Sequence, residues 1–227
     1  MIIDFLTQVI NKAEKEGAKE AEAFYCDKTE LQVRAKKKQV KIGEHKRDIG
    51  VGIRVATKGD GGPVTGFSYT TDFSKDAIDR TIKQALKTCL AKEPDPDFKG
   101  FSDKKPYKNV PEIFDKNLTE IQPEEVIDLV NRQMELASAD KHVETITGLT
   151  SLLVNEVATI NSHGISGSYK TTNFYSSIYV LAKEADSLGA GSFDYSNCFF
   201  EEEGPTRIAK EALGLAIQQL NPKPIKA

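Results

Sequence analysis

Histidine is scarce in this sequence, and its spacing does not suit a metal site. The 227 residues include only three histidines, His45, His142 and His163. No two of them lie four residues apart on a predicted helix, which is the spacing that brings two imidazoles to one zinc ion. Glu44 precedes His45, but neighbouring side chains of a strand point to opposite faces. The sequence therefore predicts no metal site in this chain.

The usual motifs of nucleophilic catalysis and phosphate binding are also missing. The sequence has no G-x-S-x-G segment. Ser162 and His163 are neighbours, but no carboxylate is placed to orient the imidazole, so a turn with positive φ at Gly164 is favoured. Residues Gly59–Gly62 are followed by Pro63 and a predicted strand instead of the Lys-Ser/Thr and helix of a phosphate loop. We predict a hairpin turn there, and no catalytic or cofactor-binding residue.

Cysteine is scarce as well, and no long apolar run occurs. Cys26, Cys89 and Cys198 are widely spaced and odd in number, which indicates neither a disulfide framework nor a C-x-x-C site. Reduced, mostly buried thiols of a cytosolic protein are the simplest interpretation. No apolar run approaches the roughly 20 residues that cross a bilayer. Asp4 interrupts the apolar N-terminus, which therefore reads as a helix and not as a signal peptide. We expect a cytoplasmic protein without a membrane partner.

Charge of either sign is present without a large excess. The formal net charge is −3, which argues against a dedicated nucleic-acid surface. The segment Lys36–Arg47 is locally basic, but it lacks aromatic residues on which bases would stack. A solvated sheet face or turn is therefore favoured. The alternative function is a non-enzymatic module that binds nucleic acid through this basic hairpin, although nucleic acid is not the partner we expect.

What the sequence does contain is one order of elements that occurs twice. Each half has an amphipathic helix, several strand-like segments and a second amphipathic helix. Two short stretches also match loosely. Ile53–Ala56 parallels Tyr179–Ala182, and Phe67-Ser68-Tyr69 parallels Phe193-Asp194-Tyr195. The corresponding strand-like segments are Thr29–Arg34, Gly50–Lys58 and Gly66–Thr71 in the first half, and Thr150–Asn155, Phe174–Lys183 and Gly191–Ser196 in the second.

This repetition predicts an α+β fold made of two repeated α-β(3-4)-α units, whose mostly antiparallel sheets pack on helices. We assign residues 1–92 to the first repeat and residues 122–227 to the second. Residues 93–121 carry Pro94, Pro96, Pro106 and Pro111 and form the expected linker. Phe98, Phe101 and Tyr107 are its expected anchoring points.

Local signals place several elements more closely. Helical spacing of Ile2, Leu6, Val9, Ile10 and Ala13 predicts the first helix. Ser74 is the expected N-cap of the second helix, and Pro123 suits the first position of the third. In the first half, separate strands are expected at Ala21–Phe24 and Thr29–Ala35, and a turn at Glu44–Arg47. In the second half, separate strands are expected at Val143–Asn155 and Val157–Asn161. The fourth helix should start near Pro205 and bury Ile208, Ala212, Leu215, Ala216 and Leu220.

Several segments together resemble the TldD/PmbA family, and they are closer to its PmbA (TldE) side. The resemblance covers essentially the whole chain. It rests on the order and spacing of its segments, which are Gly50–Val55, Gly66–Asp72, Pro94-Asp95-Pro96, Asn161-Ser162-His163-Gly164 and Leu220-Asn221-Pro222-Lys223.

The resemblance implies the N-terminal region of a two-part subunit. Members of the family, some of them called modulators of DNA gyrase, form dimers that act as zinc metallopeptidases on small peptides and unfolded segments. TldD-type subunits carry a His-Glu-x-x-x-His motif in a C-terminal domain, which we expect to be absent from this chain. Zinc would then belong to the partner or to that missing region. The expected partners are a TldD-like subunit or a second copy, together with a peptide substrate. The expected role is dimerisation and peptide guidance for proteolysis, along a path that includes Arg54, Asn161 and His163.

Overall fold

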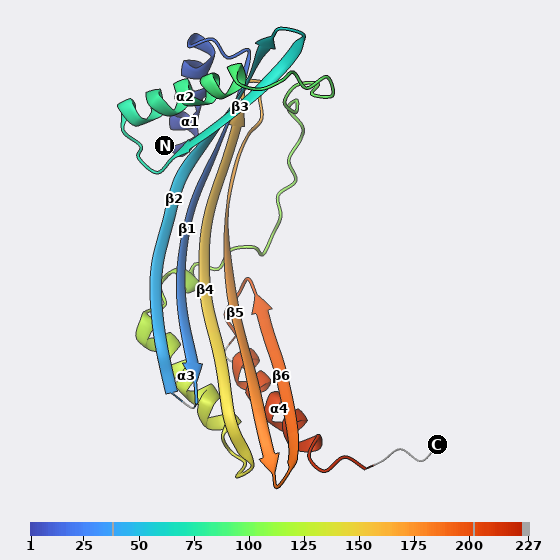
Figure 1. Cartoon of the computed structure of the whole chain (residues 1–227). Helices are drawn as coiled ribbons and strands as arrows, with labels where there is room; N and C mark the ends of the chain where they lie inside the picture. Colours follow the sequence, from blue (N-terminus) through green and yellow to red (C-terminus); the bar gives the residue numbers. More distant parts are fainter. Residues whose placement is uncertain (38, 202, 224–227) are drawn as a thin grey trace. The chain divides into compact units, whose positions relative to one another are not determined.

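The structure, a computed structural model, describes residues 1–37, 39–201 and 203–223. Its six strands form one sheet in the order β3-β2-β1-β4-β5-β6 (Figure 1). Strand β2 pairs antiparallel with β3, and β5 pairs antiparallel with β6. The α+β class and the antiparallel pairing are therefore confirmed. The strands are β1 (Glu20–Lys36), β2 (Gln39–Gly59), β3 (Gly62–Thr70), β4 (Val143–Asn161), β5 (Ser166–Glu184) and β6 (Ser187–Asn197), and the helices are α1 (Ile2–Lys15), α2 (Lys75–Leu90), α3 (Pro123–Ala137) and α4 (Glu203–Gln218), with a short 3-10 turn at Asn117–Thr119.

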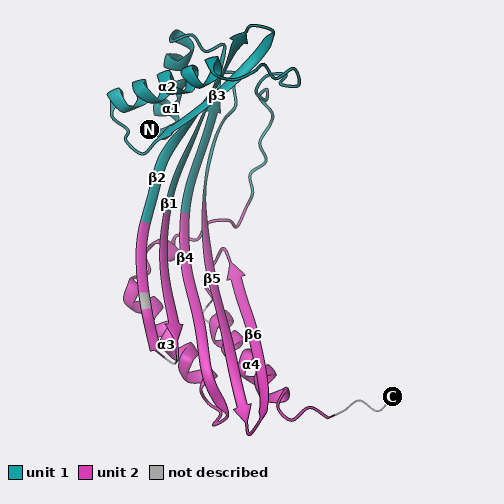
Figure 2. Ribbon diagram, viewed as in Figure 1, with its two compact units in different colours: residues 1–28, 47–110, 155–170 teal, residues 29–46, 111–154, 171–227 magenta. Residues whose placement is uncertain are grey.

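The chain divides into two compact units (Figure 2), each assembled from three stretches of sequence. Unit 1 consists of residues 1–28, 47–110 and 155–170, and unit 2 of residues 29–46, 111–154 and 171–227. Four of the five boundaries fall within β1, β2, β4 and β5, and the fifth, between residues 110 and 111, falls between α2 and α3. This division reflects contacts in space, whereas the ranges 1–92, 93–121 and 122–227 describe repetition in the sequence and stay a prediction.

Unit 1 packs α1 and α2 against one face of its strands. Leu6, Val9, Ile10 and Ala13 of α1 are buried, as their helical spacing predicts. The side chain of Ser74 accepts a hydrogen bond from the Ala77 amide (3.3 Å), so the predicted N-cap of α2 is confirmed. The shared core also takes in residues of β1–β4, namely Ala21, Ala23, Tyr25, Val51, Ile53, Val55, Val64, Ala158 and Ile160.

Unit 2 has its own core, in which α3 and α4 cover its strands. Pro123 opens α3 as predicted, and the Glu125 carboxylate accepts a hydrogen bond from the Gln122 amide (2.8 Å). Within the core, the Gln133 amide donates to Ser176 Oγ and to the Pro205 carbonyl, both at 2.9 Å. This buried polar group is therefore satisfied.

The structure corrects several local predictions. No turn occurs at Glu44–Arg47, because β2 runs without a break from Gln39 to Gly59. The chain reverses earlier, after Lys36, where Lys37 adopts a φ of 52°. The predicted pairs of short strands are single long strands, β1 and β4. Leu215 of α4 is 37% exposed and is not part of the core.

The linker expectations have a mixed outcome. Phe101 is 5% exposed and anchors its segment, whereas Tyr107 is 56% exposed. The hairpin turn before Pro63 is confirmed, because Lys58 pairs with Pro63 and Gly59 with Gly62. No described helix is both long and apolar enough to cross a membrane.

Each unit contains a close contact between a glycine of a strand and a carbonyl oxygen of a helix. Comparing the two contacts shows which strand positions correspond. A Cβ atom at Gly66 of β3 would lie 1.9 Å from the Ala85 carbonyl oxygen of α2, and one at Gly191 of β6 would lie 2.0 Å from that of Ala212 in α4. The strand partners of these glycines are Val55 and Val180. A Cβ atom at Gly189 of β6 would also lie 2.0 Å from a carbonyl oxygen of α4, but only Gly191 shares with Gly66 the approach to a helix amide nitrogen, at 3.0 Å. Val55 is therefore aligned with Val180. The sequence parallel that matched it with Leu181 is one residue out of register.

Candidate functional site

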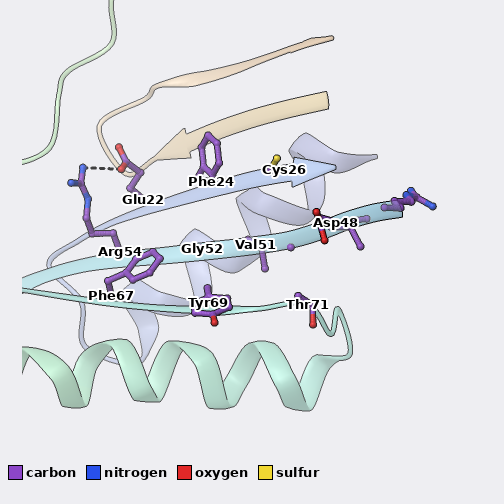
Figure 3. A pocket seen from close by; sticks show the side chains of 13 residues that line it. Glu22, Phe24, Cys26, Asp48, Val51, Gly52, Arg54, Phe67, Tyr69 and Thr71 are labelled. Atoms are coloured by element: carbon purple, nitrogen blue, oxygen red, sulfur yellow. Dashed lines mark ion pairs between the residues drawn. The ribbon is translucent and has the colours of Figure 1, made fainter. Parts of the chain in front are cut away.

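A hollow of about 740 Å³ lies on the outer face of unit 1, which we define as the face of β1–β3 turned away from α1 and α2 (Figure 3). Its walls come from alternate residues of β1 and β3, and its floor from consecutive residues of β2. The lining residues of β1 are Glu22, Phe24 and Cys26, those of β2 include Asp48, Gly50, Gly52 and Arg54, and Phe67, Tyr69 and Thr71 come from β3 and the residue after it.

Strand alternation explains why these side chains face outward. In β1 the buried residues Ala21, Ala23 and Tyr25 point to the helices, so Phe24 and its alternate neighbours point to the opposite face. In β2 the buried Val51 lies between two glycines in the same way. The hollow is therefore a consequence of which residues occupy the outward positions.

The floor of the hollow is exposed main chain. Gly50 and Gly52 have no side chain to cover it, and Val51, only 1% exposed, points into the core. A Cβ atom at Gly52 would lie 2.9 Å from the Phe67 ring, and one at Gly50 would lie 3.1 Å from the Thr70 carbonyl oxygen. Glycine at position 52 thus allows the Phe67 ring to lie directly over the strand.

Three aromatic side chains beside this floor are exposed to solvent. Phe24 is 47% exposed, Phe67 53% and Tyr69 71%. The rings of Phe67 and Tyr69 stack with their centroids 6.4 Å apart. Large apolar side chains clustered on an exposed face commonly mark an interaction surface.

Ion pairs lie at both ends of the hollow. At one end the Arg54 guanidinium is 2.8 Å from the Glu22 carboxylate, as Figure 3 shows, and 4.6 Å from the centroid of the Phe101 ring. At the other end Arg47 donates two hydrogen bonds to Asp27, of 2.8 and 2.6 Å. Asp48 is exposed beside this second pair and forms no ion pair with the described part of the chain.

The second ion pair perturbs two acid–base equilibria. The hydrogen bonds from Arg47 hold the pKa of the Asp27 carboxyl below its usual value. Burial, followed by the negative charge of Asp27, raises the pKa of Tyr25 to about 12. The Tyr25 hydroxyl lies 3.3 Å from Asp27 and is the donor of that contact. Tyr25 is therefore neutral and Asp27 ionised across the ordinary pH range.

The three residues predicted for a peptide path all contact one segment of the linker, Phe101–Lys104. Arg54 lies over the Phe101 ring. The Asn161 side-chain amide donates to the Ser102 carbonyl (2.8 Å). His163 receives a hydrogen bond on its own carbonyl from the Lys104 amide (3.3 Å). Among the three, only Arg54 also lines the hollow. A role of these residues in peptide passage stays a prediction.

Asn161 and His163 also fix the turn that follows β4. The Asn161 side-chain oxygen accepts hydrogen bonds from the amides of His163 (3.0 Å) and Ile165 (2.9 Å). Gly164 has a φ of 85°, so the predicted turn with positive φ is confirmed. The expectation that no carboxylate orients the His163 imidazole is wrong, because the ring lies between two carboxylates, with Nδ1 3.0 Å from Asp103 and Nε2 3.2 Å from Glu20.

A zinc ion does not fit this arrangement. The two nitrogens of one imidazole point in different directions, so the carboxylates beside His163 cannot converge on one ion. His142 has the same kind of surroundings, with Asp140 at 2.7 Å and Glu184 at 3.3 Å. Among residues 1–37, 39–201 and 203–223, no three His, Cys, Asp or Glu side chains are grouped as metal ligands would be.

Sequence reasoning missed the hollow, although parts of its signal are visible in the sequence. Phe24 lies between Glu22 and Cys26 at alternate positions, and β3 alternates Phe67 and Tyr69 with smaller residues. The pairing of Phe67 with Arg54 across β2 and β3 depends on register, which the sequence does not state. Without that register, two exposed aromatic residues on one strand do not define a site.

Similar folds occur in several solved structures, among them the following three. The first is a proposed modulator of DNA gyrase from Thermotoga maritima (TM-score 0.86, 19% identity, 100% of this chain and 50% of that one). The second is TldE from Thermococcus kodakarensis (TM-score 0.82, 16% identity, 92% of this chain and 46% of that one). The third is a proposed modulator of DNA gyrase from Bacteroides thetaiotaomicron (TM-score 0.82, 14% identity, 98% of this chain and 51% of that one). The chain thus spans about half the length of each of these proteins.

Sequence profiles give the family directly. A comparison with curated protein sequences finds no significant match. The profile of PmbA/TldA metallopeptidase domain 1, however, matches residues 21–89, and that of the central domain of the same family matches residues 116–220. The two matches together cover well over half of the chain. This protein therefore belongs to the PmbA/TldD metallopeptidase family, and it contains the first and central domains of a TldD/TldE-like subunit.

Proposed function

We propose that this chain acts as the peptide-holding part of a PmbA/TldE-like subunit. It binds extended or unfolded peptides and presents them for proteolysis by a metallopeptidase assembly. It joins that assembly by pairing with a TldD-like subunit or with a second copy of itself. The two family domains support the type of subunit, and the hollow of unit 1 supports peptide binding.

The observation that carries the proposal is the exposure of aromatic rings beside bare main chain. Phe67 and Tyr69 are both more than half exposed, next to a floor formed by Gly50–Gly52. Aromatic walls give affinity for apolar side chains. A floor without side chains lets the backbone of an extended ligand approach closely.

In this proposal the zinc chemistry is supplied by the partner or by a region outside this chain. His142 and His163 hold parts of their own unit together, as their carboxylate contacts show. The free thiols of Cys26, Cys89 and Cys198 fit a reducing compartment, and we propose a cytoplasmic location on that ground.

Binding of an unfolded peptide tests the proposal directly. A fluorescently labelled casein peptide should bind the purified chain, and the double variant Phe67→Ser/Tyr69→Asp should bind at least about tenfold more weakly, because two aromatic contacts are removed. Tyr169→Ser is the matched control, since Tyr169 is 54% exposed in the same unit but does not line the hollow.

Two outcomes would overturn the proposal. One is equal peptide binding by the double variant and the wild-type chain. The other is zinc-dependent peptide hydrolysis by the purified chain alone. With a TldD-like subunit added, the wild-type chain should support hydrolysis, and the double variant should lower its rate without changing co-elution of the two subunits.

A further inference from the structure

We infer that the hollow selects peptides that carry an aromatic side chain and, two residues away, a basic one. The aromatic ring lies on the main chain of Gly50–Gly52 beside Phe24, Phe67 and Tyr69, and the basic group lies near Asp48. This inference rests on the proposed function and adds a substrate class to it.

The correspondence between the units argues that the aromatic wall serves binding and not folding. Because Gly66 corresponds to Gly191, Phe67 corresponds to Ser192 and Tyr69 to Asp194. Ser192 and Asp194 are exposed, like their counterparts in unit 1. Unit 2 thus builds the same helix–strand arrangement with small or polar residues at these positions.

The aromatic residues of β6 have a different role, which strengthens the contrast. Phe193 and Tyr195 are partly buried and pack against the core of unit 2. They stand one residue away from the positions equivalent to Phe67 and Tyr69, and so they face the helices. The aromatic side chains of β3 point to solvent, whereas those of β6 do not. Exposing apolar surface to water is unfavourable, and Phe67 and Tyr69 gain no core packing in return.

The space over the two glycines suits a flat ring. Phe67 already lies over Gly52, whereas a Cβ atom at Gly50 would meet Thr70 and Thr71 and no aromatic ring. The part of the floor that no ring covers is therefore at Gly50. An aromatic side chain placed there contacts main chain below and lies beside Thr71, with Phe24 and Tyr69 on the walls next to it. Figure 3 labels Phe24, Tyr69 and Thr71. Aromatic rings gain from offset or edge contacts with other rings.

Charge decides the second feature of the ligand. Glu22 is neutralised by Arg54, and Asp27 by Arg47. Asp48 is therefore the charge that remains for a ligand. Asp48 and Gly50 are alternate residues and share the outer face. An extended peptide has the same two-residue repeat of about 6.6–6.8 Å. A ring over Gly50 thus places the residue two positions away beside Asp48.

The test uses a short capped peptide, acetyl-Gly-Ser-Lys-Gly-Phe-Ser-Gly-amide, and two relatives in which Phe is replaced by Ala or Lys by Glu. The Phe-to-Ala peptide should bind about tenfold more weakly through loss of apolar contact. The Lys-to-Glu peptide should bind about threefold more weakly, because an exposed ion pair contributes little, and this difference should shrink at high salt. On Asp48→Asn the Lys and Glu peptides should bind equally.

The protein offers its own probe of location. Cys26 lines the hollow, whereas Cys198 is partly exposed in unit 2. The bound peptide should slow alkylation of Cys26 by iodoacetamide and leave Cys198 unchanged, as measured by mass spectrometry of proteolytic fragments. Phe67→Ser/Tyr69→Asp should abolish this protection, and Tyr169→Ser should retain it.

The outcomes separate this inference from the proposed function. Equal binding of all three peptides, with Cys26 protected, would overturn the selectivity and leave peptide binding in place. Absence of peptide binding together with unchanged Cys26 reactivity would overturn both. Protection of Cys26 that rises with protein concentration, without peptide, would identify a second copy as the occupant and overturn the inference.

Discussion

The ring of Phe67 lies against Gly52, so closely that a Cβ atom at position 52 would come within 2.9 Å of it. Apart from this ring and the adjacent residues of the chain, an added Cβ atom would meet nothing within 4 Å. The glycine therefore sets the position of the aromatic wall while leaving the core beneath it untouched.

Gly52→Ala should displace the Phe67 ring and weaken peptide binding several-fold. Because the displaced atoms are the end of an exposed side chain, the free energy of unfolding should change by less than about 1 kcal/mol. Peptide titration and urea unfolding measure the two effects. Gly43→Ala is the control, since a Cβ atom there has no neighbour within 4 Å. Unchanged affinity of Gly52→Ala would show that ring position is unimportant.

Gly66→Ala and Gly191→Ala should each destabilise the protein strongly. The added methyl group would lie about 2 Å from a helix carbonyl oxygen in both units, so strand and helix must separate, at a cost of roughly 3 kcal/mol. Urea unfolding should show a similar loss for each variant. A loss below about 1 kcal/mol for either variant would contradict the close contact and the correspondence of the repeats that depends on it.

Acid should weaken unit 1 through Asp27. Its pKa is lowered by hydrogen bonds from Arg47, so the contribution of the pair to stability is present above the unfolded pKa of about 3.9 and is lost as the pH falls through the folded pKa. Asp27→Asn should remove part of the acid sensitivity of urea unfolding between about pH 5 and pH 2. An identical pH profile for wild type and variant would contradict this assignment.

A rise in pH should also destabilise unit 1, in this case through ionisation of Tyr25. Its pKa is raised to about 12, so its stabilising effect is complete below the unfolded pKa of about 10 and is lost as the pH rises through about 12. Absorbance at 295 nm should show a tyrosine that ionises near pH 12, and Asp27→Asn should lower that value. Burial also raises the pKa of Tyr195, so Tyr25→Phe is needed to identify which part of the signal belongs to Tyr25.

Asn161→Ala and His163→Ala should differ in their effects. Asn161 is 4% exposed and makes three hydrogen bonds to main-chain groups, so its replacement removes all three together and should cost about 2–3 kcal/mol. His163 is more exposed, and its loss should mainly free the linker. Limited proteolysis near residues 101–108 should therefore speed up in His163→Ala with little change in urea unfolding. Equal destabilisation by both variants would contradict this division.

The helices of this protein could be predicted from the sequence because their signals are local. The apolar spacing of α1, the cap at Ser74 and the proline at position 123 are each contained within a few residues. Periodicity and capping chemistry act at that same range. The family could also be predicted from the sequence, because the order and spacing of several segments resemble those of its members.

The strands were predicted less well because their limits depend on partners distant in sequence. A charged stretch at Glu44–Arg47 reads as a turn, yet it continues β2. The chain in fact reverses at Lys37, which has a positive φ. The sequence has no glycine at this position that would have indicated a turn. The hollow escaped prediction for the same reason, since it needs the register of β2 against β3.

The discontinuous make-up of unit 1 has a consequence for how the protein is made. Its core includes Ala158 and Ile160, which are synthesised long after α1 and α2. A ribosome must therefore release residues up to about position 170 before this unit can close. Until then this core lacks its β4 residues, so a chain that terminates near the linker would leave part of an apolar core exposed.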